Sequence, residues 1–264
     1  MRKRTGRALA MVAGLATCAT SASAEVPEKF TNLRVLPKTV SRKDLVWTMR
    51  GWASALGVRC DYCHSGGNPE TLEGVDFASD AKREKRTARA MFRMVRALNA
   101  GYLAKLEPRP AEEKGGSPPV RVECVTCHRG LSRPETIDNV LARVLAKDGA
   151  AAAVQTYKDL HSKHLSTGRY DFSQGPLNKL GERLLGEERG RDALSFLELN
   201  AENYPTGPWV LFLLGEARLA TGDRAGALEA FERTLALSPQ DAHARKRVDE
   251  LKPAAPPSSP APIP

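Results

Sequence analysis

The sequence predicts an all-α protein made of two helical parts, and three observations support this fold class. Apolar residues recur at helical spacing through residues 41–106. A 34-residue period runs through the C-terminal half. The 41% hydrophobic content is enough for a globular core. We therefore expect one helical domain at residues 25–135 and a domain of helical repeats at 136–252, followed by a disordered Pro-rich tail at 253–264.

A signal peptide is expected at residues 1–24. Four basic residues precede a short apolar run at 8–19, and the small residues 22–24 fit a cleavage site. The run is too short to span a bilayer. We expect the mature chain to begin at Glu25 in the periplasm. In an alternative interpretation, lipidation at Cys18 anchors the chain to a membrane.

The charge of the mature chain is modest. Without the signal it has 36 basic and 31 acidic residues, a formal charge of +5. No basic stripe with interleaved aromatic residues is present, so nucleic acid is not an expected partner. The run at 82–86 contains an acid and opens a helix, which favours a solvated helix face. A docking surface for an acidic partner is the alternative for this run.

All four mature cysteines lie in two Cys-x-x-Cys-His motifs, at 60–64 and 124–128. This motif is typical of covalent haem c attachment. Each thiol adds to one porphyrin vinyl group, so the two cysteines have to face the same side of a tight turn, and the next histidine then binds the iron. Two haems c are expected, with Cys60, Cys63, Cys124 and Cys127 as attachment residues and His64 and His128 as iron ligands.

Three other uses of paired cysteines fit less well. A disulfide framework would not need a histidine after each pair. A four-cysteine zinc site typically separates its pairs by about 15–20 residues, whereas 60 residues lie between these two. A thioredoxin-like redox pair requires a βαβ setting, and the surroundings here read as helix.

A sixth iron ligand is expected from methionine, of which the mature chain has three. Ser41 and Asp44 have the spacing of a helix-capping box, and Gly57 ends the same helical pattern. Met49 lies on that helix, eleven residues before Cys60, and is the candidate for the first haem. Packing in the core is the alternative role for this side chain.

A second helix is expected at residues 79–106. Met91 is centred on its apolar stripe and Met94 lies beside the stripe, so either could reach the second haem, with Met91 preferred. His161 and His164 share a helix face and could ligate iron. They lie in a polar stretch, and we expect them at the surface.

Residues 35–133 carry a family resemblance in their motifs. They resemble the cytochrome c subunit of photosynthetic reaction centres, in the diheme form found in non-photosynthetic bacteria. The resemblance implies Met49 as sixth ligand of the first haem and Met91 of the second. The two further motifs of four-haem members are missing, and the loop at 107–120 looks like an insertion. The matching segments are Leu45-Val46-Trp47-Thr48-Met49 leading to Leu56-Gly57-Val58-Arg59-Cys60, Met91-Phe92-Arg93-Met94-Val95-Arg96 leading to Asn99, and Cys124-Val125-Thr126-Cys127-His128-Arg129-Gly130.

The C-terminal period resembles tetratricopeptide (TPR) repeats, in which small residues let antiparallel helices approach and a bulky residue fills the space between them. A helix pair at 137–146 and 151–164 fits a degenerate first unit. Helical packing without a binding groove is the alternative. The recurring positions are Leu180-Gly181-Glu182, Ala193-Leu194, Glu198 and Pro205, repeated as Leu214-Gly215-Glu216, Ala227-Leu228, Glu232 and Pro239.

These features together predict an exported electron carrier rather than an enzyme. Its two haems would each have His/Met ligation, and the repeats would dock a redox partner protein. Two other functions stay open at this point. One is a diheme peroxidase-like enzyme with an open haem site, and the other is a redox-sensing scaffold.

Overall fold

The computed structural model describes residues 27, 29–106 and 120–252. These residues form helices and contain no strand, with one isolated β-bridge between Ser65 and Asp76. The all-α class is therefore confirmed for the described residues. None of their helices is long and apolar enough to cross a membrane. The expected signal peptide, the loop before Val120 and the Pro-rich tail lie outside the described residues.

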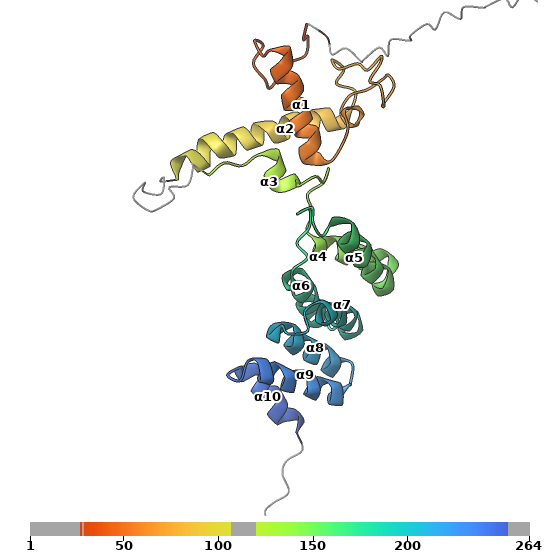
Figure 1. Cartoon of the computed structure of the whole chain (residues 1–264), viewed down its shortest axis with the longest axis vertical. Helices are drawn as coiled ribbons and strands as arrows, with labels where there is room; N and C mark the ends of the chain where they lie inside the picture. The colour runs from red at the N-terminus through yellow and green to blue at the C-terminus, as the bar shows by residue number, and fades with distance from the viewer. Residues whose placement is uncertain (1–26, 28, 107–119, 253–264) are drawn as a thin grey trace, which may run out of the picture. The chain divides into compact units, whose positions relative to one another are not determined.

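The chain divides into two compact units (Figure 1). The first contains the described residues up to 54 together with those of 58–123. The second contains 55–57 and the described residues from 124 onward. The domain boundaries expected from the sequence stay a prediction.

The first long helix, α1 (Arg42–Leu56), begins at the expected capping box. The Ser41 hydroxyl accepts a hydrogen bond from the Asp44 backbone N–H at 3.1 Å and donates one to the Asp44 carboxylate at 2.7 Å. The helix stops before Gly57, whose φ of +66° favours glycine. Both predicted ends of this helix are confirmed.

The second long helix, α2 (Arg83–Ala97), begins four residues later than expected. It continues into a π-helical turn, η2 (Leu98–Tyr102), and a 3₁₀ turn, η3 (Leu103–Lys105). The late start has a local cause, because two side chains of the helix donate hydrogen bonds to the backbone carbonyls that precede it. The Lys85 ammonium donates to the Ser79 carbonyl at 2.7 Å, and the Arg86 guanidinium donates to that of Asp80 at 2.7 Å.

One carboxylate, that of Asp80, is shared by three cations. Its oxygens lie 2.6 Å from the Arg89 guanidinium, 3.2 Å from that of Arg34 and 3.6 Å from the Lys85 ammonium. Lys85 and Arg89 are buried. The expectation of a solvated face at 82–86 is therefore wrong for Lys85, whose charge is compensated inside the unit by Asp80 and two backbone carbonyls.

We expect Asp80→Asn to destabilise the first unit because it leaves the buried Lys85 and Arg89 charges without their carboxylate. Burial opposes ionisation of Asp80, but the Arg89 hydrogen bond and charge outweigh it and lower the pKa of Asp80. The stabilisation is therefore present above the unfolded pKa of about 3.9 and is lost as pH falls through the folded pKa. Denaturant unfolding of both proteins at neutral and acidic pH should show curves that converge in acid. A difference that persists unchanged in acid would contradict this.

The second unit is a succession of antiparallel helix pairs (Figure 1). Helix α4 contacts α5, and from α6 to α10 each helix contacts the next along the chain. The contacts also join α4 with α6, α5 with α7 and α6 with α8, as in stacked repeats. The helices are α4 (Ile137–Asp148), α5 (Ala150–His164), α6 (Gln174–Gly186), α7 (Gly190–Asn203), α8 (Pro208–Ala220), α9 (Arg224–Leu237) and α10 (Ala242–Leu251).

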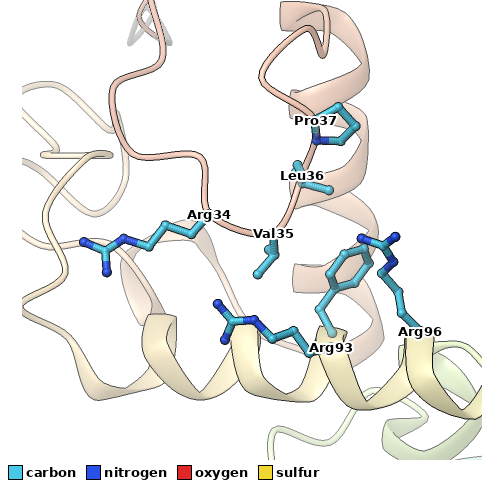
Figure 2. Close-up of a pocket in the computed structure, with 7 residues that line it drawn as sticks. Arg34, Val35, Leu36, Pro37, Arg93 and Arg96 are labelled. Carbon is cyan, nitrogen blue, oxygen red and sulfur yellow. The ribbon is translucent and has the colours of Figure 1, made fainter.

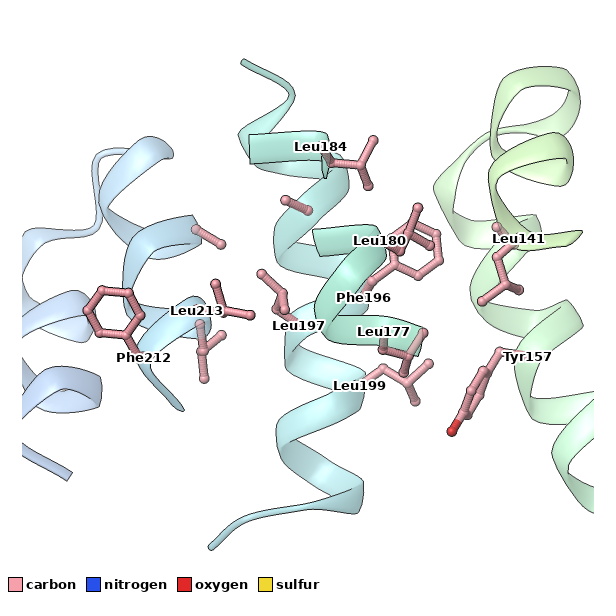
Figure 3. Packing of buried hydrophobic residues seen from close by; sticks show 14 of the residues in the cluster. Leu141, Tyr157, Leu177, Leu180, Leu184, Phe196, Leu197, Leu199, Phe212 and Leu213 are labelled. Atoms are coloured by element: carbon pink, nitrogen blue, oxygen red, sulfur yellow. The ribbon is translucent and has the colours of Figure 1, made fainter. Parts of the chain in front are cut away.

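The 34-residue period corresponds to one kind of contact, between a glycine and a bulky side chain, that occurs in two successive helix pairs. A Cβ placed on Gly181 would lie 2.6 Å from the Leu197 side chain, and one on Gly215 would lie 2.5 Å from that of Phe231. Both bulky side chains are completely buried (Figure 3 labels Leu197). The glycine therefore lets the second helix of each pair approach the first, and the predicted repeats are confirmed as helix pairs.

The pair α4 and α5 confirms the expected degenerate first unit, with Ala153 and Tyr157 buried. One detail differs from the sequence-based expectation, because His164 is buried and is not a surface residue. Its ring lies 6.1 Å from that of Tyr170, and the His161 ring lies 5.1 Å from that of Phe172. The two histidines therefore belong to an aromatic cluster at the end of α5.

Candidate haem-attachment sites

The first motif folds into a tight turn, η1 (Cys60–Tyr62). The backbone N–H groups of Cys63 and His64 both donate to the Cys60 carbonyl, at 3.2 and 3.0 Å. This turn closes one helical step between the two cysteines, as attachment of both to one porphyrin requires. The two thiols are free and half-buried. Burial raises the pKa of the Cys63 thiol, and the Glu84 carboxylate adds to the effect.

The imidazole of His64 is half-buried beside Phe77, with the ring centroids 5.0 Å apart. Burial, with the nearby Lys85 charge, lowers the pKa of His64 to about 4. The side chain is therefore neutral at physiological pH, which is the form that binds iron. Its buried Nδ1 has no hydrogen-bond partner among the described residues.

The chain after the first motif folds back on it. The Lys82 ammonium donates to the Asp61 carbonyl, and the Arg59 guanidinium donates to the Pro69 carbonyl at 2.6 Å. Gly67, with φ of +67°, allows a close approach in which a Cβ would lie 2.3 Å from the Glu73 oxygen. These contacts hold the motif turn in place from the side of residues 65–82.

The second motif forms a short helix, α3 (Cys124–His128). The Nδ1 atom of His128 lies 2.7 Å from the Leu131 carbonyl oxygen. Because a carbonyl can only accept, Nδ1 carries the proton and Nε2 is left as an electron-pair donor. The residues present therefore fit an iron-binding histidine. Cys124 is half-buried and Cys127 is exposed.

Two glycines govern the turn that follows the second motif. Gly130 has φ of +83°, and its N–H donates to the Ala55 carbonyl at 2.8 Å. A Cβ on Gly57 would lie 2.1 Å from the Gly130 oxygen, and one on Gly130 would lie 2.9 Å from the Arg169 side chain. A larger residue at position 57 would require a backbone shift, whereas one at position 130 would displace the Arg169 side chain and be strained by the positive φ.

Asn99 anchors the chain just before the second motif. Its amide donates to the Val122 carbonyl at 2.8 Å and its oxygen accepts from the Val122 N–H at 2.9 Å. Both polar groups of one backbone unit are thus satisfied by one side chain, which fixes Val122 two residues before Cys124. The sequence did not predict this role for Asn99, although Asn99 ends one of the segments that resemble the cytochrome c subunit family.

The three candidate methionines lie on the two long helices, as expected. Met49 is half-buried on α1. Met91 and Met94 are 40% and 45% exposed on α2, and the exposed Leu98 and Tyr102 extend this apolar strip. Such a strip matches the kind of surface that a porphyrin face covers. The assignment of these methionines as sixth ligands stays a prediction.

A comparison of structures pairs the chain with the first TPR domain of the human RPAP3 protein. The TM-score is 0.31 at 15% sequence identity, with 44% of this chain and 86% of that domain covered.

Comparison with known families and proteins concerns the other end of the chain. Residues 24–144 match the family model of the photosynthetic reaction centre cytochrome c subunit. The reaction centre cytochrome c subunit of Thermochromatium tepidum is 33% identical over 99 residues, which are 36% of this chain and 23% of that protein. The corresponding subunit of Rubrivivax gelatinosus is 32% identical over 117 residues, or 39% and 30%.

Cytochrome c-554 of Chloroflexus aurantiacus is 38% identical over 85 residues, which are 31% of this chain and 17% of that protein. The chain thus spans less than a third of the length of these curated relatives. The matched residues include both Cys-x-x-Cys-His motifs and the two long helices. Residues 24–144 therefore resemble the cytochrome c subunit family of photosynthetic reaction centres, and a helical repeat region follows them.

Proposed function

We propose that this protein carries two covalently attached haems c and transfers electrons outside the cytoplasm. The observation that carries the proposal is the local geometry of the two motifs. Each pair of cysteines closes a single helical step, and the histidine follows directly. At the second motif the Leu131 carbonyl also fixes the imidazole tautomer that leaves Nε2 for iron.

Attachment requires no external oxidant. Each Sγ–H adds across one vinyl double bond of the porphyrin, so that a carbon–sulfur bond forms and the proton goes to the neighbouring vinyl carbon. The haem iron, when bound, supplies the one-electron chemistry. The chain contributes the two turns, a neutral His64 and a His128 of fixed tautomer.

The sixth ligands in this proposal are Met49 for the first haem and Met91 for the second, with Met94 as the alternative to Met91. Thioether ligation gives relatively high reduction potentials, as suits an electron carrier. The half-burial of Met49 and the exposed strip around Met91 support these assignments. An iron with two axial ligands has no open position for peroxide, which favours a carrier over a peroxidase-like enzyme.

Export to the periplasm rests on the signal at residues 1–24, and membrane attachment would require lipidation at Cys18. The helical repeats are proposed to hold a redox partner protein. Their support is the stacked arrangement, since stacked helix pairs present an extended binding surface.

The sixth ligands can be tested by optical spectroscopy of the purified holoprotein. We expect a methionine-to-iron charge-transfer band from both ferric haems. Met49→Ala and Met91→Ala should each abolish the band of one haem, because each removes one thioether ligand. Met94→Ala is the matched control and should leave both bands. Loss of a band in Met94→Ala but not in Met91→Ala would transfer the assignment to Met94, and a high-spin haem in the unaltered protein would contradict the carrier function.

A further inference from the structure

A pocket of about 350 Å³ lies in the first unit, between residues 34–37 and helix α2 (Figure 2). Its apolar wall consists of Val35, Leu36 and Pro37 together with the ring of Phe92. Three guanidinium groups surround it, from Arg34, Arg93 and Arg96. The pocket therefore combines an apolar wall with three positive charges around it.

On the side of α2 that lines the pocket, only the positive charges near the N-terminus of the helix are compensated. Lys85, Arg89, Phe92 and Arg96 follow each other at helical spacing. Asp80 and backbone carbonyls neutralise the first two, which are buried. Within the part of the chain that the structure describes, neither Arg93 nor Arg96 has a carboxylate partner. The same Asp80 is also the partner of Arg34, whose side chain is 62% exposed.

Helical geometry separates this pocket from the proposed haem-binding strip. Phe92, Arg93 and Arg96 lie on one side of α2, and Met91 and Met94 lie on the opposite side. The pocket is therefore not part of the proposed second haem site.

We propose that this pocket is a docking site for an acidic redox partner protein. An acidic segment of the partner would place carboxylates on the Arg93 and Arg96 guanidiniums, which suit bidentate pairing. A neighbouring apolar side chain of the partner would enter the pocket against Phe92. The choice of a redox protein as the partner rests on the proposed electron transfer. The acidic character of the partner follows from charge complementarity with the arginines of the pocket.

The extent of the charge favours a protein over a small anion. Arg86 continues the cationic side of α2 beyond the pocket, and it is exposed. A surface of this length steers a large acidic partner during diffusional encounter. Such steering weakens as added salt screens it.

The test measures the second-order rate of electron transfer by stopped flow. The probes are an acidic flavodoxin as donor and, for comparison, a basic mitochondrial-type cytochrome c. The variant Arg93→Glu/Arg96→Glu is matched by Lys43→Glu/Arg50→Glu, which reverses the same charge at two exposed positions of α1 that do not line the pocket. Reduction by dithionite and thermal unfolding of all proteins control for haem function and folding.

We expect the reversal at Arg93 and Arg96 to slow the flavodoxin reaction at least about tenfold at low salt, and to flatten its salt dependence. The control reversal at Lys43 and Arg50 should change the rate less than about twofold, because neither side chain lines the pocket. Equal rates for the unaltered protein and the Arg93/Arg96 variant would overturn the proposal. A faster reaction of the unaltered protein with the basic cytochrome would do the same.

Two further outcomes separate this proposal from others. If Arg93→Glu/Arg96→Glu abolished binding to phosphatidylglycerol vesicles while the flavodoxin rate stayed unchanged, the pocket would serve an anionic membrane, and the partner proposal would be wrong. A protein that dithionite could not reduce reversibly would contradict the proposed electron transfer instead.

Discussion

Replacing Cys60 and Cys63 by alanine should lower the covalently bound haem from two to one per chain. Replacing Cys124 and Cys127 should do the same, and the fourfold variant should carry none. The reason is chemical, because each proposed haem would be held by two thioether bonds that need both thiols of its own motif. A pyridine haemochrome assay of acid-precipitated protein, together with peroxidase staining after denaturing electrophoresis, measures the ratio.

The matched control for these variants keeps the thiols and removes the ligand. His128→Ala leaves both cysteines of the second motif in place, so covalent haem can persist while the iron loses its axial nitrogen and its low-spin spectrum. A ratio of two that survived in either double-cysteine variant would contradict attachment at that motif. A ratio of one in the unaltered chain would contradict the proposed pair of haems.

Phe231→Ala should cost the repeat unit about 3–5 kcal/mol of unfolding free energy. The ring is completely buried, and it fills the space that Gly215 leaves beside α8. Removing the ring opens a cavity, which Gly215 cannot fill because it has no side chain. Denaturant unfolding followed by far-ultraviolet circular dichroism measures the loss, and the indole fluorescence of Trp209, which stacks on Phe212 at 5.0 Å, gives a second reading.

Leu237→Ala is the control for that substitution, since this leucine lies on the same helix and is 45% exposed. It should change stability by less than about 0.5 kcal/mol. Equal effects of the two substitutions would mean that the glycine–phenylalanine contact does not stabilise the repeats.

The sequence predicted the helix ends and repeats that depend on neighbouring residues. The Ser41–Asp44 box and Gly57 define α1 because capping is a local interaction. The close approach of paired helices at small residues was also expected, since Gly181 and Gly215 recur 34 positions apart. In each case the determining residues lie close together in the chain or repeat at a fixed spacing.

The features that the sequence did not predict depend on side-chain contacts that hydrophobic periodicity does not indicate. The start of α2 moved because Lys85 and Arg86 bind the carbonyls before it, in competition with helical hydrogen bonds. His164 is buried because Tyr170 folds back against it, which local polarity does not indicate. The cationic pocket needs residues 34–37 beside Phe92, Arg93 and Arg96 of α2, which follow them by more than fifty positions.

The Asn99–Val122 pairing has a consequence for how this chain can vary. Two hydrogen bonds join the Asn99 side chain to the backbone of Val122. They hold these two residues together whatever the length of the segment between them. Doubling the length of a flexible loop costs only about 0.6 kcal/mol in closure entropy. Insertions and deletions after η3 and before Val122 can therefore accumulate over evolution, or be engineered, without shifting the start of the second motif.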